Sequence, residues 1–503
     1  MIATTTPNPT ARESAYEDLR NAMVRAGFTE TGVCSHYSIS SLRLLRLDID
    51  LIENPTAPDD AFRCLARLFI ECRYVPEDRL TEHLGAGTVA AMRELGILEG
   101  SGEETWSNVM LCPVAGLLMA TDRWTDPAGH REQAPDDILY PAHAPNTLIL
   151  LGSALFGRCE RVLDLCSGTG IAGLYASRLA GRVVAADINP RATEYARFNA
   201  RLNAIGNLEA RTGDLWDAAA GETFDLVVGH PPYVPIFRQK WIFHSGGVDG
   251  EQICQKIISG LPGHLKPGGR YCGLMMSSDR KDGTVESRVR AWLGAAHEEF
   301  DVVVVSLRTF ELDAFVDSTV LKNSGTLQDV KAWREKLDAL GVQRFNFCNL
   351  IIERVAGGRP GATARRTDGP ASGRAEYEWL LGLEQAAASP GFAERLLDAR
   401  LFPPVRMAMQ ISHELEAGTW MANSYTLTVE YPFRVTLAVP GWQAVLVSKC
   451  DGTRTGREFY EAYRDGGAIP ENVSAYSFGL ALQVLVQAGF VEMEGFRTPR
   501  AAG

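Results

Sequence analysis

The sequence contains no stretch of 18 consecutive apolar residues and no C-x-x-C pair among its ten cysteines. The first absence argues against a transmembrane helix, and the second against a thiolate zinc site or a disulfide framework. The N-terminus has no basic region followed by an apolar segment, so no signal peptide is expected. A net charge of -12 gives no global attraction to nucleic acid or to anionic membranes. We therefore expect a cytoplasmic protein with reduced thiols and no membrane contact.

The chain of 503 residues is longer than one ordinary domain. Its patterns predict a helical, winged-helix-like domain over 1–130, an α/β domain over 140–356 and an α+β, winged-helix-like domain over 375–503. Two segments of loop-forming composition, 125–137 and 357–374, are expected to be linkers.

Short apolar strands alternate with helical segments in the middle domain, which predicts a parallel sheet covered by helices on both faces. Seven strands are expected, at Arg161–Leu165, Val183–Asp187, Leu208–Arg211, Phe224–Gly229, Arg270–Met276, Val302–Leu307 and Asn349–Arg354. An insertion over 308–346 separates the last two strands and contains an expected helix at Leu327–Leu340. Insertions of this length are usually functional or disordered, so we interpret this one as a candidate lid.

A glycine-containing loop, Asp164-Leu165-Cys166-Ser167-Gly168-Thr169-Gly170, follows the first expected strand. Its glycines let the backbone approach a ligand closely, and the next helix offers free N–H groups at its start. Asp187 ends the second strand, where a carboxylate can bind both hydroxyls of a ribose. Asp214 follows the third strand and can accept a hydrogen bond from an adenine amino group. The motif His230-Pro231-Pro232-Tyr233 follows the fourth strand.

These motifs, with Gly246-Gly247-Val248-Asp249-Gly250 and Leu265-Lys266-Pro267-Gly268-Gly269 after them, resemble those of class I methyltransferases. Among these, the chain resembles the release factor glutamine methyltransferases (the HemK type) and related N-methyltransferases, over roughly 140–356. The resemblance implies a Rossmann-like seven-stranded sheet and S-adenosylmethionine as cofactor. The implied cofactor-binding residues are Asp164, Cys166, Ser167, Gly168, Gly170, Asp187, Ile188, Asp214, Leu215 and His230. A nicotinamide-binding domain would use similar glycines, but the Pro-Pro-Tyr and Lys-Pro-Gly-Gly motifs do not belong to it.

The chain departs from the family pattern at two positions. The family often has glycine where Cys166 stands, and we interpret this cysteine as a small packing residue of the pocket. The acceptor motif of the N-methyltransferases begins with Asn, Asp or Ser, whereas here it begins with His230. A neutral imidazole offers one acceptor and one donor, so it can accept from an amine N–H. It can also act as a general base for a hydroxyl, a thiol or an acidic carbon.

The resemblance assigns catalysis to His230, Pro231 and Tyr233. The expected reaction is N-methylation of a peptide, a protein side chain or an amine-bearing natural product. Methylation of oxygen or carbon with His230 as base, adenine methylation in a nucleic acid, and a catalytically silent scaffold remain open alternatives. Tyr233, His143 and His244 are candidate substrate-binding residues, and no metal site is expected.

Four further residues near these motifs carry weaker expectations. Asn146 is a candidate for the pocket, and Asp249 is a candidate N-cap of the following helix. Trp241 and Phe243 are candidates for an aromatic acceptor pocket, although core packing is the commoner role for such residues.

The last domain contains an Asp451-Gly452 turn followed by Thr455 at an expected helix start. This short pattern resembles the PqqD-like winged-helix modules that recognise leader peptides. The resemblance implies peptide binding or self-association, so a homodimer is among the expected states. No dense Lys/Arg stripe is present, which places nucleic acid low among the expected partners.

Overall fold

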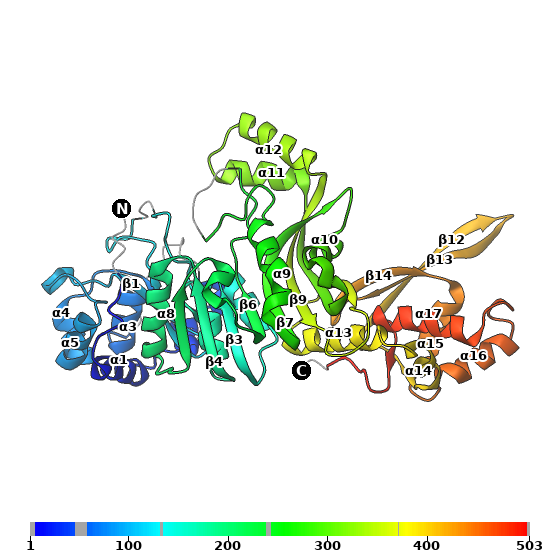
Figure 1. The fold of residues 1–503 in the computed structure, drawn as a ribbon, viewed down its shortest axis with the longest axis horizontal. Coiled ribbons are helices and arrows are strands. Elements are labelled where there is room, and N and C mark those ends of the chain that lie inside the picture. The colour runs from blue at the N-terminus through cyan, green and yellow to red at the C-terminus, as the bar shows by residue number, and fades with distance from the viewer. Residues whose placement is uncertain (1–5, 46–57, 131–133, 238–242, 371, 500–503) are drawn as a thin grey trace. The chain divides into compact units, whose positions relative to one another are not determined.

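The computed structural model describes residues 6–45, 58–130, 134–237, 243–370 and 372–499 (Figure 1). The chain forms two compact units, one made of Met1–Ser277 with Val316–Leu340 and the other of Ser278–Phe315 with Gly341–Gly503. The three expected domain boundaries and the winged-helix resemblances stay predictions.

The first unit begins with short helices and a hairpin. The helices are α1 (Glu13–Arg25), α2 (Glu30–His36), α3 (Ala61–Leu65), η2 (Ala66–Ile70), α4 (Glu77–Leu84) and α5 (Ala86–Glu94). The strands β1 (Val109–Val114) and β2 (Leu117–Asp122) pair antiparallel. The amphipathic helix expected over 12–26 is confirmed, because α1 buries Tyr16 and Leu19 on one face.

A parallel sheet forms the centre of the first unit. Its strands are β3 (Cys159–Leu165), β4 (Ala180–Asp187), β5 (Leu208–Thr212), β6 (Phe224–Gly229) and β7 (Leu265–Arg280). They lie in the order β7-β6-β3-β4-β5. The helices α6 (Pro145–Ser153), α7 (Ile171–Ala176), α8 (Pro190–Leu202) and α9 (Gln252–His264) come between or before these strands. The expected α/β class is confirmed, and all five expected strands of this region are present.

The register of these strands brings the motifs to one edge of the sheet. Leu165 at the end of β3 pairs with Ala186 of β4 and with Gly229 at the end of β6. Ligands of open α/β sheets bind outside the carboxyl ends of parallel strands. The ends of these three strands are therefore neighbours in the sheet. They place the glycine-containing loop, Asp187 and the His230 motif side by side at this edge.

The insertion over 308–346 contains two helices, α11 (Leu312–Lys322) and α12 (Leu327–Ala339). The helix expected at Leu327–Leu340 is confirmed. Its start is fixed by a capping box, in which Thr326 and Asp329 satisfy each other's backbone N–H groups. Trp333 of this helix is buried.

The second unit contains a mixed sheet. The last two expected strands of the α/β domain are present as β8 (Phe300–Glu311) and β9 (Val342–Arg354), which pair antiparallel. The interpretation of 357–374 as a linker is wrong in part, because β10 (Thr363–Asp368) pairs parallel with β8. This strand carries few apolar side chains, and ion pairs from Arg365 to Asp279 and from Arg366 to Glu384 accompany it instead.

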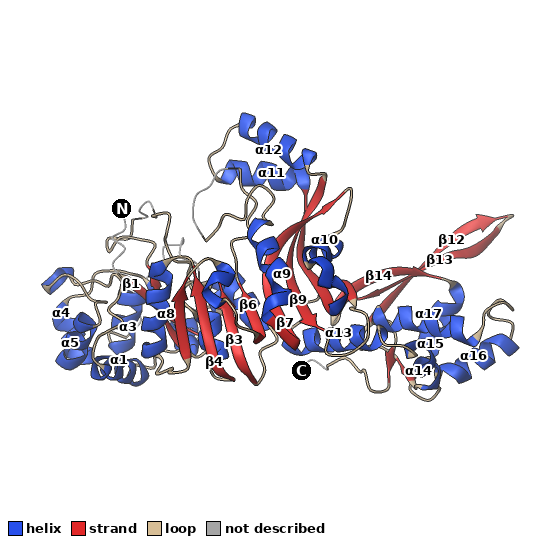
Figure 2. Ribbon diagram, viewed as in Figure 1, coloured by secondary structure: helices blue, strands red, loops and turns tan. Residues whose placement is uncertain are grey.

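The rest of the second unit packs helices beside a long hairpin (Figure 2). The strands β12 (Met407–Glu416), β13 (Thr419–Val429) and β14 (Phe433–Val439) pair antiparallel in sequence, and the short strands β11 (Leu401–Phe402) and β15 (Glu492–Met493) pair with each other. The helices are α10 (Val285–Trp292), α13 (Arg374–Ala387), α14 (Phe392–Asp398), α15 (Gly441–Lys449), α16 (Gly456–Asp465) and α17 (Ala475–Gln487). The expected strands near 425–430 and 435–439 and the expected helices near 457–463 and 477–488 are confirmed. The strand β12 was not expected, because its side chains are almost all exposed.

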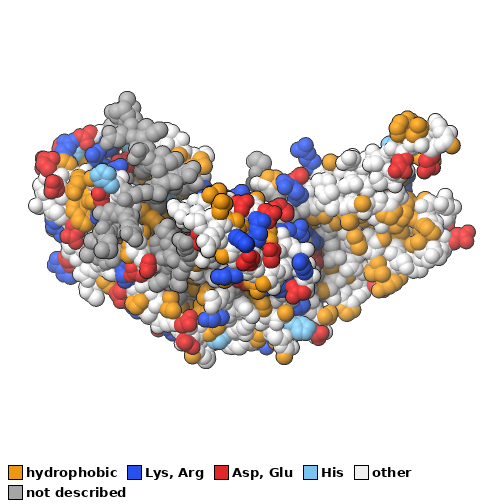
Figure 3. All heavy atoms as spheres, turned by 90° about the horizontal axis from the view of Figure 1, so that it is seen from above, with side chains coloured by type: hydrophobic (Ala, Val, Ile, Leu, Met, Phe, Trp, Pro, Cys, Tyr) orange, Lys and Arg blue, Asp and Glu red, His pale blue; other side chains and the backbone are white. Residues whose placement is uncertain are grey.

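On the face shown in Figure 3, acidic and basic side chains are interspersed rather than gathered by sign. Within the described ranges, no helix is both long enough and apolar enough to cross a membrane.

Candidate functional site

The loop between β3 and α7 makes a tight turn through residues in the left-handed region. Cys166, Gly168 and Gly170 have φ angles of 55°, 52° and 84°. A side chain on Gly168 would meet nothing within 4 Å, so this backbone borders open space. A side chain on Gly170 would instead lie 3.0 Å from Ala196 of α8. Gly168 thus leaves room for a ligand, while Gly170 allows α7 and α8 to pack closely.

Asp187 links the end of β4 to this loop. Its Oδ2 accepts a hydrogen bond from Gly168 N at 2.8 Å, and its Oδ1 accepts from Asn189 N at 2.9 Å. Burial raises the pKa of the carboxyl, and these backbone donors oppose the rise. Each oxygen keeps a further lone pair for a ligand hydroxyl.

Asp164 lies beneath the loop rather than beside it. Its side chain is buried, and Oδ2 accepts from Gly173 N at 2.7 Å near the start of α7. Burial raises its pKa to about 7. The carboxyl therefore anchors α7 to the end of β3.

A cavity of about 390 Å³ opens at this edge of the sheet and joins the loop to the His230 motif. Among the cofactor-binding and catalytic candidates, all but Gly170 line it. The lining candidates are Asp164, Cys166, Ser167, Gly168, Asp187, Ile188, Asp214, Leu215, His230, Pro231 and Tyr233. Asn146, Phe243 and His244 line it as well, whereas His143 does not. The structure thus gathers at one cavity residues that are spread over about a hundred positions of the chain.

His230 stands directly after β6, and its backbone N donates to Leu165 O at 3.4 Å. Burial lowers the pKa of the imidazole to about 4, so the ring is neutral at physiological pH. Its ring stacks near that of Tyr233, with centroids 5.8 Å apart and 26° between the planes. The hydroxyl of Tyr233 accepts a hydrogen bond from Asn146 Nδ2 at 2.8 Å.

Tyr140 completes an aromatic group around His230. Its ring meets the imidazole edge-on, with centroids 6.1 Å apart, and lies 5.2 Å from the ring of Phe243. Tyr140 also lines the cavity. The contact of Tyr140 with His230 is not predictable from the sequence, because the two residues are remote in the chain. The described acceptor end of the cavity is therefore aromatic, with a neutral histidine at its centre.

Glycines support the backbone of the acceptor motif from behind. A side chain on Gly250 would lie 2.4 Å from Tyr233 O, and one on Gly246 would lie 2.8 Å from the carbonyl carbon of Tyr233. Close packing of the two loops therefore requires glycine at both positions. The same segment reaches the insertion, because Trp333 Nε1 of α12 donates to Val248 O at 3.0 Å.

Three of the weaker expectations have different outcomes. Asp249 is not the N-cap of α9, which is Glu251; the Oδ1 of Asp249 instead accepts from Glu251 N at 3.1 Å. His143 is buried, and its Nδ1 has no hydrogen-bond partner among the described residues. Trp241 lies outside the described residues.

The site residues fit a cofactor that contains a nucleoside with free ribose hydroxyls. The hydroxyl of Ser167 is buried in the cavity wall and has no hydrogen-bond partner among the described residues, so it has a free donor and free acceptors for a ligand. The open backbone at Gly168 and the carboxylate of Asp187 offer complementary contacts on the same loop.

Comparison with known proteins gives the same family over this region. The family model described as methyltransferase small domain matches residues 147–292. A release factor glutamine methyltransferase from Cereibacter sphaeroides is 32% identical over 229 residues, which cover 42% of this chain and 77% of the relative. A ribosomal protein uL3 glutamine methyltransferase from Bradyrhizobium diazoefficiens is 31% identical over 157 residues, covering 28% and 49%. A match to the crystal structure of ribosomal protein L11 methylase from Lactobacillus delbrueckii subsp. bulgaricus has 18% sequence identity and a TM-score of 0.24. It covers 39% of the present chain and 71% of the methylase chain.

Proposed function

Because this chain belongs to the release factor glutamine methyltransferase family of class I methyltransferases, we propose that it methylates a side-chain amide nitrogen of a protein. The enzyme depends on S-adenosylmethionine, which supplies an electrophilic methyl group on a sulfonium when it is bound. The observation that carries the proposal is the neutral, buried His230 at the acceptor end of the cavity.

The protonation of His230 separates the alternatives. A general base works best when its pKa lies near the working pH. A histidine whose pKa is about 4 is a poor base for a hydroxyl, a thiol or a carbon acid. It remains a good acceptor of an N–H hydrogen bond. These properties favour an acceptor that keeps its proton until the methyl group has moved.

An amide nitrogen has this property. Its lone pair is delocalised into the carbonyl, so the nitrogen must become pyramidal before it can attack. Hydrogen bonds to both N–H groups favour the pyramidal form, which stabilises the transition state more than the ground state. The nitrogen–carbon bond forms as the carbon–sulfur bond breaks, and the product nitrogen then carries an extra proton. An N-methylated, N-protonated amide is a strong acid, so even a weak base such as His230 can take that proton.

The other members of the motif support an amide acceptor. The imidazole nitrogen and a proline carbonyl of Pro231 or Pro232 supply two acceptors for one NH₂ group. The ring of Tyr233, fixed through Asn146, offers a flat surface for the planar amide. Relatives named as acting on a release factor and on ribosomal protein uL3 support a protein as the acceptor.

Incubation of cell extract with isotopically labelled S-adenosylmethionine and purified enzyme tests the proposal. We expect the label on a glutamine or asparagine side chain of a protein, located by tryptic peptide mass spectrometry. Label on a hydroxyl, a carbon atom or a nucleic acid would contradict it.

A pair of variants at one position sharpens this test. His230→Asn replaces the imidazole with a side-chain amide oxygen that can also accept a hydrogen bond, and it should keep at least a tenth of the activity. His230→Leu, which removes the acceptor but keeps a similar volume, should lose a hundredfold or more. Equal losses in both variants would instead indicate that His230 must remove a proton from the acceptor before or during methyl transfer.

A further inference from the structure

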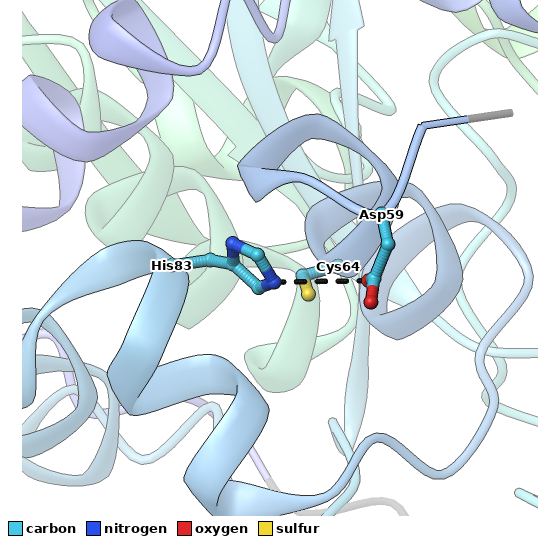
Figure 4. A group of neighbouring side chains, drawn as sticks. All are labelled: Asp59, Cys64 and His83. Carbon is cyan, nitrogen blue, oxygen red and sulfur yellow. Dashed lines mark ion pairs between the residues drawn. The ribbon is translucent and has the colours of Figure 1, made fainter.

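Three side chains that can bind a metal ion converge in the helical part of the first unit (Figure 4). Asp59 precedes α3, Cys64 lies in α3, and His83 lies in the last turn of α4. One ligand atom from each lies within 4.8 Å of the others. We infer that Asp59, Cys64 and His83 form a binding site for a divalent cation of the zinc class.

The His83 ring carries the strongest indication. Its Nε2 is shielded from solvent and has no hydrogen-bond partner among the described residues. A buried ring nitrogen without a hydrogen-bond partner is energetically unfavourable unless a ligand satisfies it. The same nitrogen points between the other two ligand atoms, and lies 3.7 Å from Asp59 Oδ1. That separation is too long for a hydrogen bond, but it is close to the distance between two ligand atoms around a tetrahedral metal ion.

The ligand chemistry selects zinc over calcium or magnesium. Zinc binds thiolate sulfur at about 2.3 Å and imidazole nitrogen or carboxylate oxygen at about 2.0–2.2 Å, usually with tetrahedral geometry. Ligand atoms around such an ion lie roughly 3.5 Å apart. Calcium and magnesium prefer oxygen ligands alone. Because the side chain of Asp59 is 60% exposed, it can adjust its rotamer to close the site at little cost.

The three protein ligands leave one position of a tetrahedral ion to water. Cysteine binds such an ion as the thiolate, so the Cys64 thiol must lose its proton when the cation binds. Binding replaces the S–H bond with a sulfur–metal bond and releases one proton to solvent. Affinity should therefore rise with pH.

Arg79 is the natural competitor for Asp59. Its guanidinium pairs with the Asp59 carboxylate and, at 2.8 Å, with Glu82. A bound cation would replace Arg79 as the partner of the Asp59 carboxylate, and Arg79 would remain paired with Glu82. The position of the guanidinium thus predicts that metal affinity is limited by this exchange and increases when the charge of Arg79 is removed.

Titration of the purified, metal-free full chain with Co²⁺ tests the inference, because cobalt reports on its ligands by absorption. We expect one ion per chain with tetrahedral d–d bands and a thiolate-to-cobalt charge-transfer band, and displacement by Zn²⁺. Cys64→Ser should abolish the charge-transfer band, and His83→Gln should weaken binding at least tenfold. Arg79→Gln should tighten binding severalfold.

Cys34→Ser provides the matched control, because Cys34 is a half-buried cysteine of the same unit outside the cluster. This variant should bind cobalt as the parent does. Far-UV circular dichroism shows whether each variant is folded. If Cys64→Ser does not fold, the opposite effects expected of the two single variants His83→Gln and Arg79→Gln provide the test. Absence of the charge-transfer band in the parent, or its persistence in Cys64→Ser, would overturn the inference.

Discussion

The hydroxyl of Tyr233 and the side-chain amide of Asn146 are joined by a 2.8 Å hydrogen bond across 87 positions of the chain. Asn146 lies in the first turn of α6, whereas Tyr233 closes the acceptor motif after β6. The bond fixes the ring that we propose as the platform for the acceptor amide. A helix that precedes the sheet thus positions a side chain that follows its fourth strand along the chain.

Asn146→Ala should lower kcat about fivefold to tenfold, the equivalent of a neutral hydrogen bond worth about 1 kcal/mol. Tyr233→Phe, which keeps the ring and removes the hydroxyl, should have a similar effect. Steady-state kinetics of the two variants and of the double variant check this, because the double variant should be no worse than either alone. Asn472→Ala, at an exposed asparagine between α16 and α17, is the control. Strictly additive losses would contradict coupling between the two residues.

The stability of the protein should fall on acidification because His143 and His230 are buried in the neutral form. Burial lowers the pKa of each to about 4, below the value of 6.5 of an exposed histidine. Between these values the unfolded chain binds protons that the folded protein does not, so stability is lost as pH falls from 6.5 towards 4. Each histidine should contribute a loss of about 2 kcal/mol at pH 5.

Urea denaturation of His143→Leu at pH 7.5 and pH 5 isolates one of these contributions. The difference in unfolding free energy between the two pH values should shrink by about 2 kcal/mol relative to the parent. His413→Asn, at an exposed position of β12, should leave the difference unchanged. An unchanged difference in His143→Leu would show that His143 is protonated in the folded state.

Asp164 should act in the opposite direction. Burial raises its pKa to about 7 from the ordinary value of 3.8, so the folded protein holds a proton that the unfolded chain has released. This contribution is fully present below pH 3.8 and is lost as pH rises through 7. Asp164→Asn keeps an oxygen to accept from Gly173 N, and should reduce the loss between pH 5 and pH 8 by roughly 3 kcal/mol.

Thermal or urea unfolding without cofactor measures this effect. Asp136→Asn, at an exposed aspartate, serves as the control and should not change the pH dependence. An Asp164→Asn variant whose stability follows the same curve as the parent between pH 5 and pH 8 would contradict the buried-acid account.

The sequence predicted the parts of the fold that depend on continuous apolar runs. All seven strands expected between 161 and 354 are present, and strands such as β6 and the first half of β8 are buried almost throughout and leave a continuous apolar pattern. Two strands that it missed have other patterns: β10 is rich in arginine and β12 is exposed. Their stability comes from ion pairs and cross-strand hydrogen bonds, for which periodicity gives no signal.

The site was predictable where its residues follow strands and not where they meet across the fold. Asp187, Asp214 and most of the loop at Asp164–Gly170 line the cavity, whereas Leu165 is buried and Gly170 packs against Ala196. The aromatic partner Tyr140 and the pair of Asn146 with Tyr233 depend on tertiary contacts. Similarly, the sequence shows that Cys166 stands where the family often has glycine. Only the structure shows that this non-glycine residue has an unfavourable backbone conformation, with a φ of 55°.

The contact between Trp333 and Val248 should connect the insertion to substrate binding. Trp333 Nε1 donates to Val248 O at 3.0 Å. The Trp333 ring also lies 5.9 Å from the ring of Phe237, which follows the His230 motif in the chain. Trp333→Phe removes the donor and keeps an aromatic ring. We expect KM for the acceptor to rise about fivefold to tenfold, as for the loss of one hydrogen bond, and kcat to change little.

The cofactor should be unaffected by this change, because Trp333 does not line the cavity. Calorimetric titration with S-adenosylmethionine should therefore give the same dissociation constant for Trp333→Phe and the parent. Trp420→Phe, at an exposed tryptophan of β13, controls for the loss of an indole. If α12 served only the stability of its own region, Trp333→Phe would lower the melting temperature and leave KM for the acceptor unchanged. A rise in that KM at an unchanged cofactor affinity is therefore the result that assigns the insertion to acceptor binding.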